Sequence, residues 1–504
     1  MLRSYEFNVA ERYGCLTSSL PSNTSIHSTW PKENIRRNLP EFLSIATTVI
    51  SQSSKLADSS QYVLMGMPIH VVNGDRLNMN IMNQLPSTGL SIHFHGFEMK
   101  NAIEYDGVVG LTQCAVPPQN QFNYNFEIEE TDGTYWYHTH SGNLGINSQN
   151  IIKGPLIVHP DTSQSRILVD KLHANATHDQ VPKMVDYRHL LSYESERILF
   201  FSEGFQKSDV ANEFYSLGGL HPPVPYNDDG FVSAVAEFEF GTVNGKLREV
   251  VQVEKGQTYT FRLLNGGSHF AFRISIDGLP MVIIAADSHP VIPYEVDEVI
   301  LHNAERFNVN ITIPDNFSHG DRLWIRADTL ETRNNGFQNG IRAILHVVEE
   351  IDDYDTPDDS SVIDPIEDIA EGPIPPGDRR TMNCYSNLEM VEAKKNGRGG
   401  CFPITVLEAL SEKELKLDKL EVVDESTTTA FHTVDFDVNP APLHAYFTRI
   451  GNGNWYQHTL NSKTHFLKPD FDPINDMHPN SAIMDVPAYA PVIIIWRNRS
   501  IMEQ

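Results

Sequence analysis

The chain has 504 residues, of which 66 are acidic and 38 are basic, so its formal net charge is −28. This excess of acidic residues argues against partners that carry phosphate groups, namely nucleic acids and anionic membrane surfaces. The length is typical of about three domains, and no apolar run approaches the roughly 18 residues that a membrane-spanning helix needs. The composition therefore predicts a multidomain protein with no nucleic-acid partner and no membrane span.

The first 160 residues show strand patterns after an irregular start. Leu77, Met79 and Ile81 alternate with polar residues, and a period of two is typical of antiparallel strands with one buried face. Leu16 to Ser60 is rich in Ser, Thr and Asn instead, which predicts an insertion or a disordered loop. The strands expected in this part lie at residues 3–12, 77–81, 122–128 and 154–158.

Two His-x-His pairs lie in this part, each among aromatic residues and next to a glycine. They are Ser91-Ile92-His93-Phe94-His95-Gly96 and Tyr135-Trp136-Tyr137-His138-Thr139-His140-Ser141-Gly142. Because residues i and i+2 of a strand point to the same face, each pair directs two imidazoles the same way. Two such strands facing each other would form a four-imidazole site, and imidazole is a favoured ligand of copper, zinc, iron and nickel.

A single His-x-His pair on a strand is more often a packing or surface feature than a set of metal ligands. Two pairs in one expected domain, both with aromatic and glycine neighbours, favour a metal site instead. A zinc hydrolase is an alternative, because an open zinc position held by histidines activates water. Such sites usually add a carboxylate ligand near the pair, and the pattern of this chain does not favour one.

The middle of the chain predicts a second β domain. Asp161 to Arg197 has a mixed pattern and is expected to be a connecting segment. Turn signals at Asn265-Gly266-Gly267 and Asp277-Gly278 then separate alternating apolar stretches, as in a series of short strands. The strands expected here lie at residues 260–264, 270–276, 307–313 and 341–348.

The last third contains an acidic segment and a few further elements. Glu349 to Asp378 is acidic and contains proline, which favours a solvated linker over a cation site. Strands are expected at residues 434–438 and 492–496, and Pro403 to Leu420 has apolar residues at helical spacing. Since helical periodicity is otherwise almost missing, the many short strands predict an all-β chain of β-sandwich domains in series.

Cysteines and sequons give weaker information about the compartment. The four cysteines contain no CxxC motif, which excludes a zinc ribbon, and they allow three pairings into two disulfides. We favour Cys15 with Cys114 and Cys384 with Cys401. The first residues lack the apolar stretch of a secretory signal, whereas five Asn-x-Ser/Thr sequons are weak support for secretion. The sequons begin at Asn23, Asn175, Asn310, Asn316 and Asn498.

The histidine motifs and their neighbours resemble the multicopper oxidase family, and within it the laccase-like group. The first histidine motif resembles the first copper motif of the family, and Gly133 to Ser141 resembles the second. The segments that are similar elsewhere are Tyr105-Asp106-Gly107-Val108, Leu111-Thr112-Gln113-Cys114, Phe261-Arg262-Leu263-Leu264-Asn265, Ala285-Ala286-Asp287, Glu305-Arg306-Phe307 and Trp324-Ile325-Arg326-Ala327-Asp328-Thr329. The resemblance is good over roughly residues 62–348 and loose elsewhere.

This resemblance implies tandem cupredoxin-like β-sandwich (Greek-key) domains and a copper enzyme that oxidises its substrate one electron at a time while reducing dioxygen to water. The implied domains are 1–160 with an insertion at 16–60, 161–348, an acidic linker at 349–380, and a partial third domain at 381–504. The implied partners are a small-molecule reductant and dioxygen, and the implied location is extracellular. The oligomeric state stays open.

The resemblance also implies a role for each residue of the two copper motifs. His93 would ligate the single type 2 copper, and the remaining three histidines of the motifs would ligate the type 3 pair. Asp106 would be an acid beside the cluster that supplies protons for dioxygen reduction. Its alternative role is that of a turn residue before Gly107, because Asp-Gly favours a turn. The three type 3 candidates are His95, His138 and His140.

The end of the chain departs from the family pattern. The other half of the cluster ligands, and a Cys between two His at the electron-accepting copper, come from the third domain in the family. No His-x-His or His-Cys-His occurs after residue 140, and the sequence ends at Gln504, about where the third histidine motif should begin. We interpret the sequence as cut short before the C-terminal copper motifs, and expect this form to be inactive or impaired.

The resemblance, together with this departure, leaves two functions. The first is a laccase-type copper oxidoreductase that acts on phenolic or aromatic compounds or on low-valent metal ions. The alternative is a non-catalytic copper-binding protein with the same fold. In either case we expect no blue-copper absorption from this sequence, because it has no thiolate between two histidines.

Overall fold

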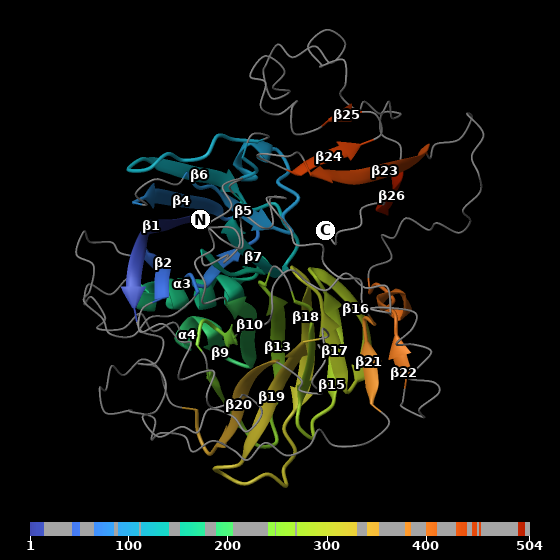
Figure 1. The fold of residues 1–504 in the computed structure, drawn as a ribbon. Coiled ribbons are helices and arrows are strands. Elements are labelled where there is room, and N and C mark those ends of the chain that lie inside the picture. Colours follow the sequence, from blue (N-terminus) through green and yellow to red (C-terminus); the bar gives the residue numbers. More distant parts are fainter. Residues whose placement is uncertain are drawn as a thin grey trace.

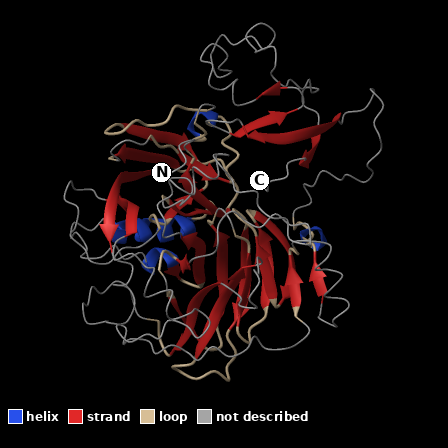
Figure 2. Ribbon diagram, viewed as in Figure 1, coloured by secondary structure: helices blue, strands red, loops and turns tan. Residues whose placement is uncertain are grey.

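Two β-sandwich units and a smaller C-terminal sheet make up the described part of the chain (Figures 1 and 2). The computed structural model describes residues 1–14, 43–50, 65–84, 89–109, 112–140, 152–176, 188–204, 240–246, 248–267, 270–329, 340–351, 379–384, 400–410, 430–440, 446–450, 453–454 and 492–498. Strands dominate these residues, so the expected all-β class with sandwich domains is confirmed.

The first unit packs two four-stranded sheets, in the orders β2-β1-β4-β6 and β3-β8-β7-β5. Its strands are β1 (Leu2–Gly14), β2 (Leu43–Ile50), β3 (Ile69–Val72), β4 (Arg76–Asn83), β5 (Ile92–His95), β6 (Gln121–Glu127), β7 (Gly133–Thr139) and β8 (Lys153–His159). β4 buries Leu77, Met79 and Ile81, as its alternation predicts. The rings of Phe94 on β5 and Tyr124 on β6 meet edge to face, 5.5 Å between centroids, so the two sheets enclose one apolar core.

Strand β2 lies inside the segment that the sequence predicts to be an insertion or a disordered loop. It pairs antiparallel with β1, from Phe7 opposite Ile50 to Gly14 opposite Leu43. Its Ser and Thr content hides the strand signal, because composition alone favours a loop. The rest of that segment, residues 16–42 and 51–60, lies outside the described residues.

The connecting segment after the first unit contains a helix that the sequence analysis did not predict. Helix α3 (Ser163–Ala176) begins after Thr162, whose Oγ1 accepts a hydrogen bond from the Ser165 amide at 3.1 Å. Such a cap is a common start of a helix, and the buried Val169 and Leu172 follow at helical spacing. A second, short helix is α4 (Arg188–Leu191). Among the described residues, none of the helices is long and apolar enough to cross a membrane.

The second unit is the larger sandwich. One sheet has the order β11-β10-β13-β18-β15-β16, with β9 beside β10, and the other has the order β12-β20-β19-β14-β17-β21-β22. Its strands are β9 (Ser192–Tyr193), β10 (Glu196–Gly204), β11 (Phe240–Val243), β12 (Val250–Glu254), β13 (Thr258–Asn265), β14 (Phe272–Ile276), β15 (Met281–Ala286), β16 (His289–Val296), β17 (Glu298–Leu301), β18 (Arg306–Thr312), β19 (Arg322–Thr329), β20 (Gly340–Val348), β21 (Arg380–Met382) and β22 (Gly400–Phe402). Ile274 and Val309 lie fully buried in its core.

The last two strands of this unit shift the boundary that the sequence predicts. β21 pairs parallel with β17 and β22 pairs parallel with β21, although both follow or overlap the end of the expected linker at 349–380. Met382 is fully buried in the core of the second unit. These strands join the second unit because an edge strand such as β17 presents backbone N–H and C=O groups with which a further strand can pair. Residues 352–378 of the expected linker lie outside the description.

The C-terminal part contributes a four-stranded sheet in the order β25-β24-β23-β26. Its strands are β23 (Ala430–Pro440), β24 (Tyr446–Ile450), β25 (Gly453–Asn454) and β26 (Val492–Asn498). The two strands expected here are present, and they pair with each other in parallel. The helix expected at Pro403 to Leu420 is not formed at its start, where Ile404–Val406 is a single 3-10 turn, and residues 411–420 lie outside the described part.

Of the two expected disulfides, the second is present. Cys384 and Cys401 are bonded, with their Cα atoms 5.8 Å apart, and the bond joins the segments that carry β21 and β22. Cys114 is an exposed free thiol, and its expected partner, Cys15, lies outside the described residues.

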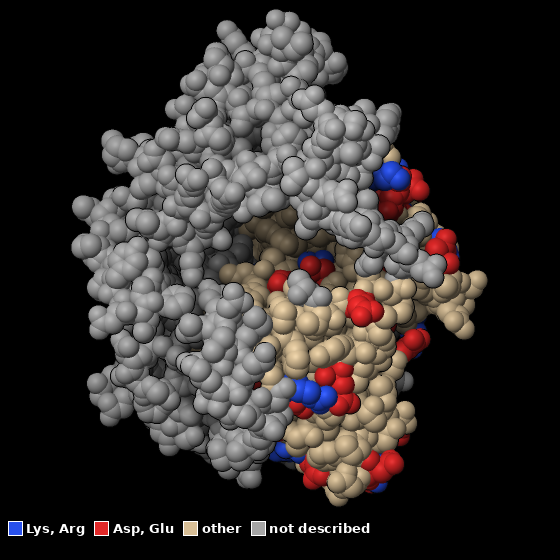
Figure 3. All heavy atoms as spheres, turned by 90° about the vertical axis from the view of Figure 1, so that its right-hand side faces the viewer, with Lys and Arg blue, Asp and Glu red and all other residues tan. Residues whose placement is uncertain are grey.

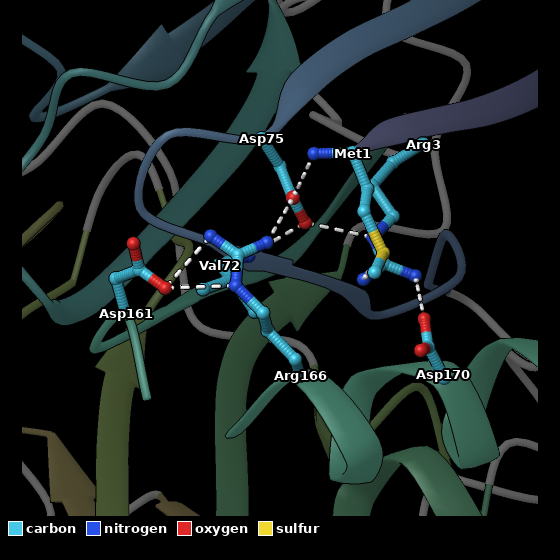
Figure 4. A network of polar contacts seen from close by, with 7 residues as sticks. All are labelled: Met1, Arg3, Val72, Asp75, Asp161, Arg166 and Asp170. Atoms are coloured by element: carbon cyan, nitrogen blue, oxygen red, sulfur yellow. Dashed lines mark hydrogen bonds and ion pairs between the residues drawn. The ribbon is translucent and has the colours of Figure 1, made fainter. Parts of the chain in front are cut away.

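A buried carboxylate of the first unit binds both the start of β1 and helix α3 (Figure 4). Asp75 is fully buried and accepts hydrogen bonds from Arg3 Nε at 2.7 Å and from the Met1 amino group at 2.7 Å. Arg166 of α3 lies 3.1 Å from the same carboxylate. Burial by itself would raise the pKa of Asp75, but the hydrogen bonds from Arg3 and the amino group hold it below its ordinary value.

Replacing Asp75 by Asn should lower the free energy of unfolding by about 3 kcal/mol or more, because the buried Arg3 guanidinium loses its counter-charge. The control is Asp161→Asn, whose exposed carboxylate pairs with Arg166 and should contribute about 0–1 kcal/mol. Urea denaturation measures both. Equal losses in the two variants would contradict the role given to Asp75.

The same comparison has a pH signature. The folded-state pKa of Asp75 is lowered. Its contribution to the free energy of unfolding is therefore fully present above the ordinary aspartate pKa of about 3.9. This contribution is lost as pH falls through the folded-state pKa. The difference between wild type and Asp75→Asn should therefore be constant from pH 7 to 5 and shrink below pH about 4.

Candidate metal centre

The four expected histidines come together through the pairing of two neighbouring strands. β5 and β7 are antiparallel, and their register places His93 directly opposite His138 and His95 opposite Trp136. His140 follows β7 immediately, and its backbone amide donates to Ser91 O at 3.3 Å. From the ring centroid of His93, the rings of His95, His138 and His140 lie at 5.5, 5.3 and 5.3 Å.

The sheet that carries these histidines has one apolar face and one polar face. Ile92 and Phe94 of β5 alternate with the histidines and are buried in the core of the first unit. The histidine face is turned toward the second unit, where Trp136 meets Phe200 at 6.0 Å between ring centroids. On the same face, Lys153 Nζ donates to Gly266 O at 2.6 Å. The second unit therefore covers part of the histidine face.

Hydrogen bonds at Nδ1 fix the tautomers of two imidazoles. His93 Nδ1 lies 2.6 Å from Asp106 O, and His138 Nδ1 lies 2.9 Å from Thr139 O. Because a carbonyl oxygen can only accept, each Nδ1 carries the proton and each Nε2 keeps its lone pair. A backbone carbonyl that orients the other ring nitrogen in this way is typical of metal-binding histidines.

The nitrogens of three histidines converge on one point. One ligand nitrogen from each of His93, His95 and His138 lies within 4.8 Å of the other two, and His95 Nδ1 is 3.4 Å from His138 Nε2. Burial, followed by the neighbouring His93, lowers the pKa of His95 to about 3 and also lowers that of His138. Neutral imidazoles are the form that binds metal, so this donor set fits copper or zinc.

His140 lies at the rim of this group. It is solvent-exposed and adjoins residues outside the description. Its ring is 5.9 Å from that of His138, but it is not among the three residues whose ligand atoms converge. Trp136 supports the centre from one side, because its ring stacks on those of His95 and His138 at 5.0 and 4.3 Å.

Asp106 ends a 3-10 turn (Ile103–Tyr105) and also contacts a histidine. Its Oδ1 lies 3.2 Å from His93 Nδ1. Gly107 follows with φ +84°, and a Cβ at this position would stand 1.9 Å from Ile92 O, so only glycine fits between the turn and β5. Ser91 Oγ donates to Gly107 O at 2.5 Å. Asp106 is thus a turn residue, as one alternative predicts, and it also lies beside a candidate ligand; its proton-supplying role stays a prediction.

The acidic residues that the structure describes in the second unit do not form a second cation site. Asp277 pairs with Arg326, and Asp297 pairs with Arg380. Glu305 accepts hydrogen bonds from the His302 amide and the Asn383 side chain. On the face seen in Figure 3, acidic and basic side chains of the described residues lie next to one another instead of forming a patch of one sign. Among the described residues, His93, His95 and His138 form the one group that could hold an ion.

Two segments of the chain match models of one protein family. Residues 59–163 and residues 222–350 each match a family described as multicopper oxidase. The chain is 26% identical over 349 residues to Laccase-1 of Pleurotus ostreatus, which covers 66% of this chain and 58% of that protein. It is 29% identical over 266 residues to Laccase-1 of Agaricus bisporus, with 52% and 45% covered. The chain thus spans about half the length of the curated relatives it matches.

Two solved structures share the fold at low sequence identity. The laccase from Botrytis aclada superposes with a TM-score of 0.53 and 19% identity, and covers 90% of this chain and 64% of that one. Fet3p, a multicopper oxidase that functions in iron import, gives a TM-score of 0.54 and 17% identity with the same coverage. These superpositions support the expected cupredoxin-like fold.

A second histidine pair, which the sequence analysis did not single out, lies on the same sheet. His70 Nδ1 and His159 Nε2 are 3.0 Å apart, and His70 Nε2 is 2.9 Å from Leu190 O. The carbonyl can only accept, so His70 donates from Nε2 and accepts at Nδ1 from His159. Tyr193 packs edge-on against His70 and donates to Glu196. Nothing in the sequence signals this pair, because the two residues lie on different strands.

Protonation of this pair should destabilise the fold in mild acid. Burial, followed by the charge of Arg262, lowers the pKa of His159 to about 3. The neutral His159 ring contributes fully to the free energy of unfolding above the unfolded-state pKa of about 6.5. This contribution is lost progressively as pH falls below that value. Stability should drop by up to about 1.4 kcal/mol per pH unit for this group.

The variant His159→Gln keeps a donor but cannot titrate, so its urea midpoint should fall less than that of wild type between pH 7 and pH 5. His289→Gln is the control at an exposed position. Parallel pH profiles for wild type and His159→Gln would show that this pair does not set the acid sensitivity.

Proposed function

Because this chain belongs to the multicopper oxidase family, we propose that it is a laccase-type copper oxidoreductase, in which the histidine face of the first unit supplies copper ligands. The reaction is the oxidation of a small-molecule reductant with reduction of dioxygen to water. The observation that carries the proposal is the register of β5 and β7, which aligns His93 with His138.

We assign the ligands according to the family pattern. His93 binds the type 2 copper through Nε2, and His95, His138 and His140 bind the type 3 pair. The Nδ1 hydrogen bonds of His93 and His138 support this assignment, since they leave Nε2 free to coordinate. When bound, copper supplies one-electron transfer and the binding of dioxygen. The protein holds the imidazoles neutral and oriented, and the covering second unit keeps water from one side of the centre.

Asp106 is the proposed proton carrier. Reduction of dioxygen to water consumes protons, and a positioned carboxylate is a suitable donor. Its Oδ1 lies beside His93 Nδ1, and the side chain is only partly exposed, so it can exchange protons with solvent while it touches a ligand. The backbone carbonyl of the same residue orients His93. The two functions of Asp106 therefore reside in different groups, which a side-chain substitution separates.

The substrate class in this proposal is phenolic or aromatic compounds or low-valent metal ions. The relatives named laccase favour the first class, and the role of Fet3p in iron import favours the second. We also propose an extracellular, glycosylated protein. Of two sequons in the second unit, Asn316 lies exposed in a turn, whereas the Asn310 side chain accepts a hydrogen bond from Thr260.

The alternative is a copper-binding protein without turnover. It is favoured by the fact that, among the described residues, one compact ligand group is present and no cysteine belongs to it. Dioxygen consumption with a phenolic reductant distinguishes the two functions, because only the oxidoreductase consumes dioxygen at a rate above that of free copper.

Copper binding should depend on His138. We expect wild type to retain copper through dialysis against a weak chelator, and His138→Ala to lose about a hundredfold in affinity or more, since a ligand is at least as important as its supporting residues. His289→Ala, at an exposed position on β16, should bind like wild type. Metal analysis after dialysis measures all three. Full retention of copper by His138→Ala would refute the ligand assignment.

Asp106→Asn should leave copper affinity unchanged, because the backbone carbonyl that holds His93 remains. The residual dioxygen consumption that an impaired form retains should fall by about a hundredfold, the range of a general acid. Asp106→Glu retains an acid and should recover part of the rate. Loss of copper together with activity in Asp106→Asn would instead assign the side chain a structural role.

A further inference from the structure

Arg306 extends from the second unit to the strands that carry the histidines. It is the first residue of β18 and is 5% exposed. Its Nε donates to Thr134 O at 2.8 Å, on β7 and four residues before His138. Its Nη1 donates to Ala304 O at 3.2 Å. The guanidinium therefore connects the turn before β18 with the backbone of a histidine strand.

The same guanidinium lies against the residue that follows His95. Gly96 has φ +92°, and a Cβ built on it would stand 2.7 Å from Arg306 Nη2 and 3.1 Å from Tyr135 Cδ1. The space beside this backbone is thus filled by Arg306 and Tyr135. Any movement of Gly96 toward the second unit would meet the guanidinium, so Arg306 limits where β5 can end.

Arg306 is itself held firmly in place. The Asp287 side chain accepts a hydrogen bond from the Arg306 amide at 3.0 Å and pairs with its Nη1 at 3.0 Å. The Asp287 amide donates to Arg306 O at 2.7 Å. Asp287 adopts φ +52°, a conformation that the paired contacts stabilise at this turn. Contacts therefore fix both the backbone of Arg306 and its guanidinium group.

Strand β5 needs such support, because it is the edge strand of its sheet in the described part of the chain. It pairs with β7 on one side. On its other side Ile92 N donates to Tyr124 OH at 2.7 Å, which fixes its start. At its end, next to His95, Arg306 and the Tyr135 ring of β7 fill the space beside Gly96.

We propose that Arg306 is a positioning residue for the copper centre: by bonding to Thr134 O and filling the space beside Gly96, it sets the separation of His95 and His138. This inference rests on the proposed function, and it extends the centre to a residue of the second unit that binds no metal. It means that the ligand geometry of the first unit depends on the docking of the second.

The test compares Arg306→Lys and Arg306→Met with wild type in the full chain. Lysine keeps the charge but cannot reproduce the planar fork of donors, and methionine removes the donors altogether. Arg326→Lys is the matched control, because Arg326 is equally buried in the second unit and makes a bidentate pair with Asp277 on its other sheet. Each protein is titrated with Cu²⁺ against a competing chelator, the Cu(II) electron paramagnetic resonance spectrum is recorded, and the urea midpoint is measured.

We expect both Arg306 variants to bind Cu²⁺ about tenfold more weakly or worse, the effect of losing support around a ligand, with altered copper hyperfine splitting. Arg326→Lys should lower the urea midpoint but leave affinity and spectrum unchanged. Wild-type affinity and spectrum in both Arg306 variants would overturn the inference and leave the proposed function intact. Failure of wild type itself to bind Cu²⁺ would overturn the proposed function together with the inference.

Discussion

The pairing of β5 with β7 is the constraint on which the candidate centre depends. It sets His93 opposite His138 and, by the pleat, sends Ile92 and Phe94 to the opposite face. A slip by one residue would turn the imidazoles into the apolar core and bring the core residues out. The core and the centre therefore specify the same register, and neither can be lost without the other.

The second unit contacts the histidine face of the first unit. Its contacts with the histidine face include the Lys153 ammonium, the Trp136 ring and the Arg306 guanidinium. Lys153 and Arg306 form hydrogen bonds across the boundary between the units, which offset the cost of burying them, and Trp136 meets the Phe200 ring there. The histidine face would be an unusual surface in an isolated sandwich, whereas here it becomes an interior with fixed hydrogen-bonding requirements. Residues of both units thus line the histidine face.

Features that depend on a local residue pattern can be predicted from the sequence. Contacts between strands that are far apart in the sequence cannot. The period of two at Leu77–Ile81 and the His-x-His spacing predict the strands and one face of the centre, because both depend on the pleat alone. The second histidine pair, His70 with His159, and the place of Arg306 depend on which strands become neighbours. No local pattern encodes those neighbours. β2 and α3 were missed for a different reason, since Ser and Thr serve equally in loops, strands and helix caps.

The contact of Gly107 with Ile92 limits how the backbone at Asp106 can move. With no room for even a methyl group between them, and with Ser91 fastening the same turn, the backbone around Asp106 and strand β5 form one rigid piece. The carboxyl group can then rotate about its own side-chain bonds only. Under the proposal that Asp106 carries protons, the transfer depends on side-chain rotation and not on loop closure, so its rate should be insensitive to solvent viscosity, unlike that of an enzyme gated by a moving lid.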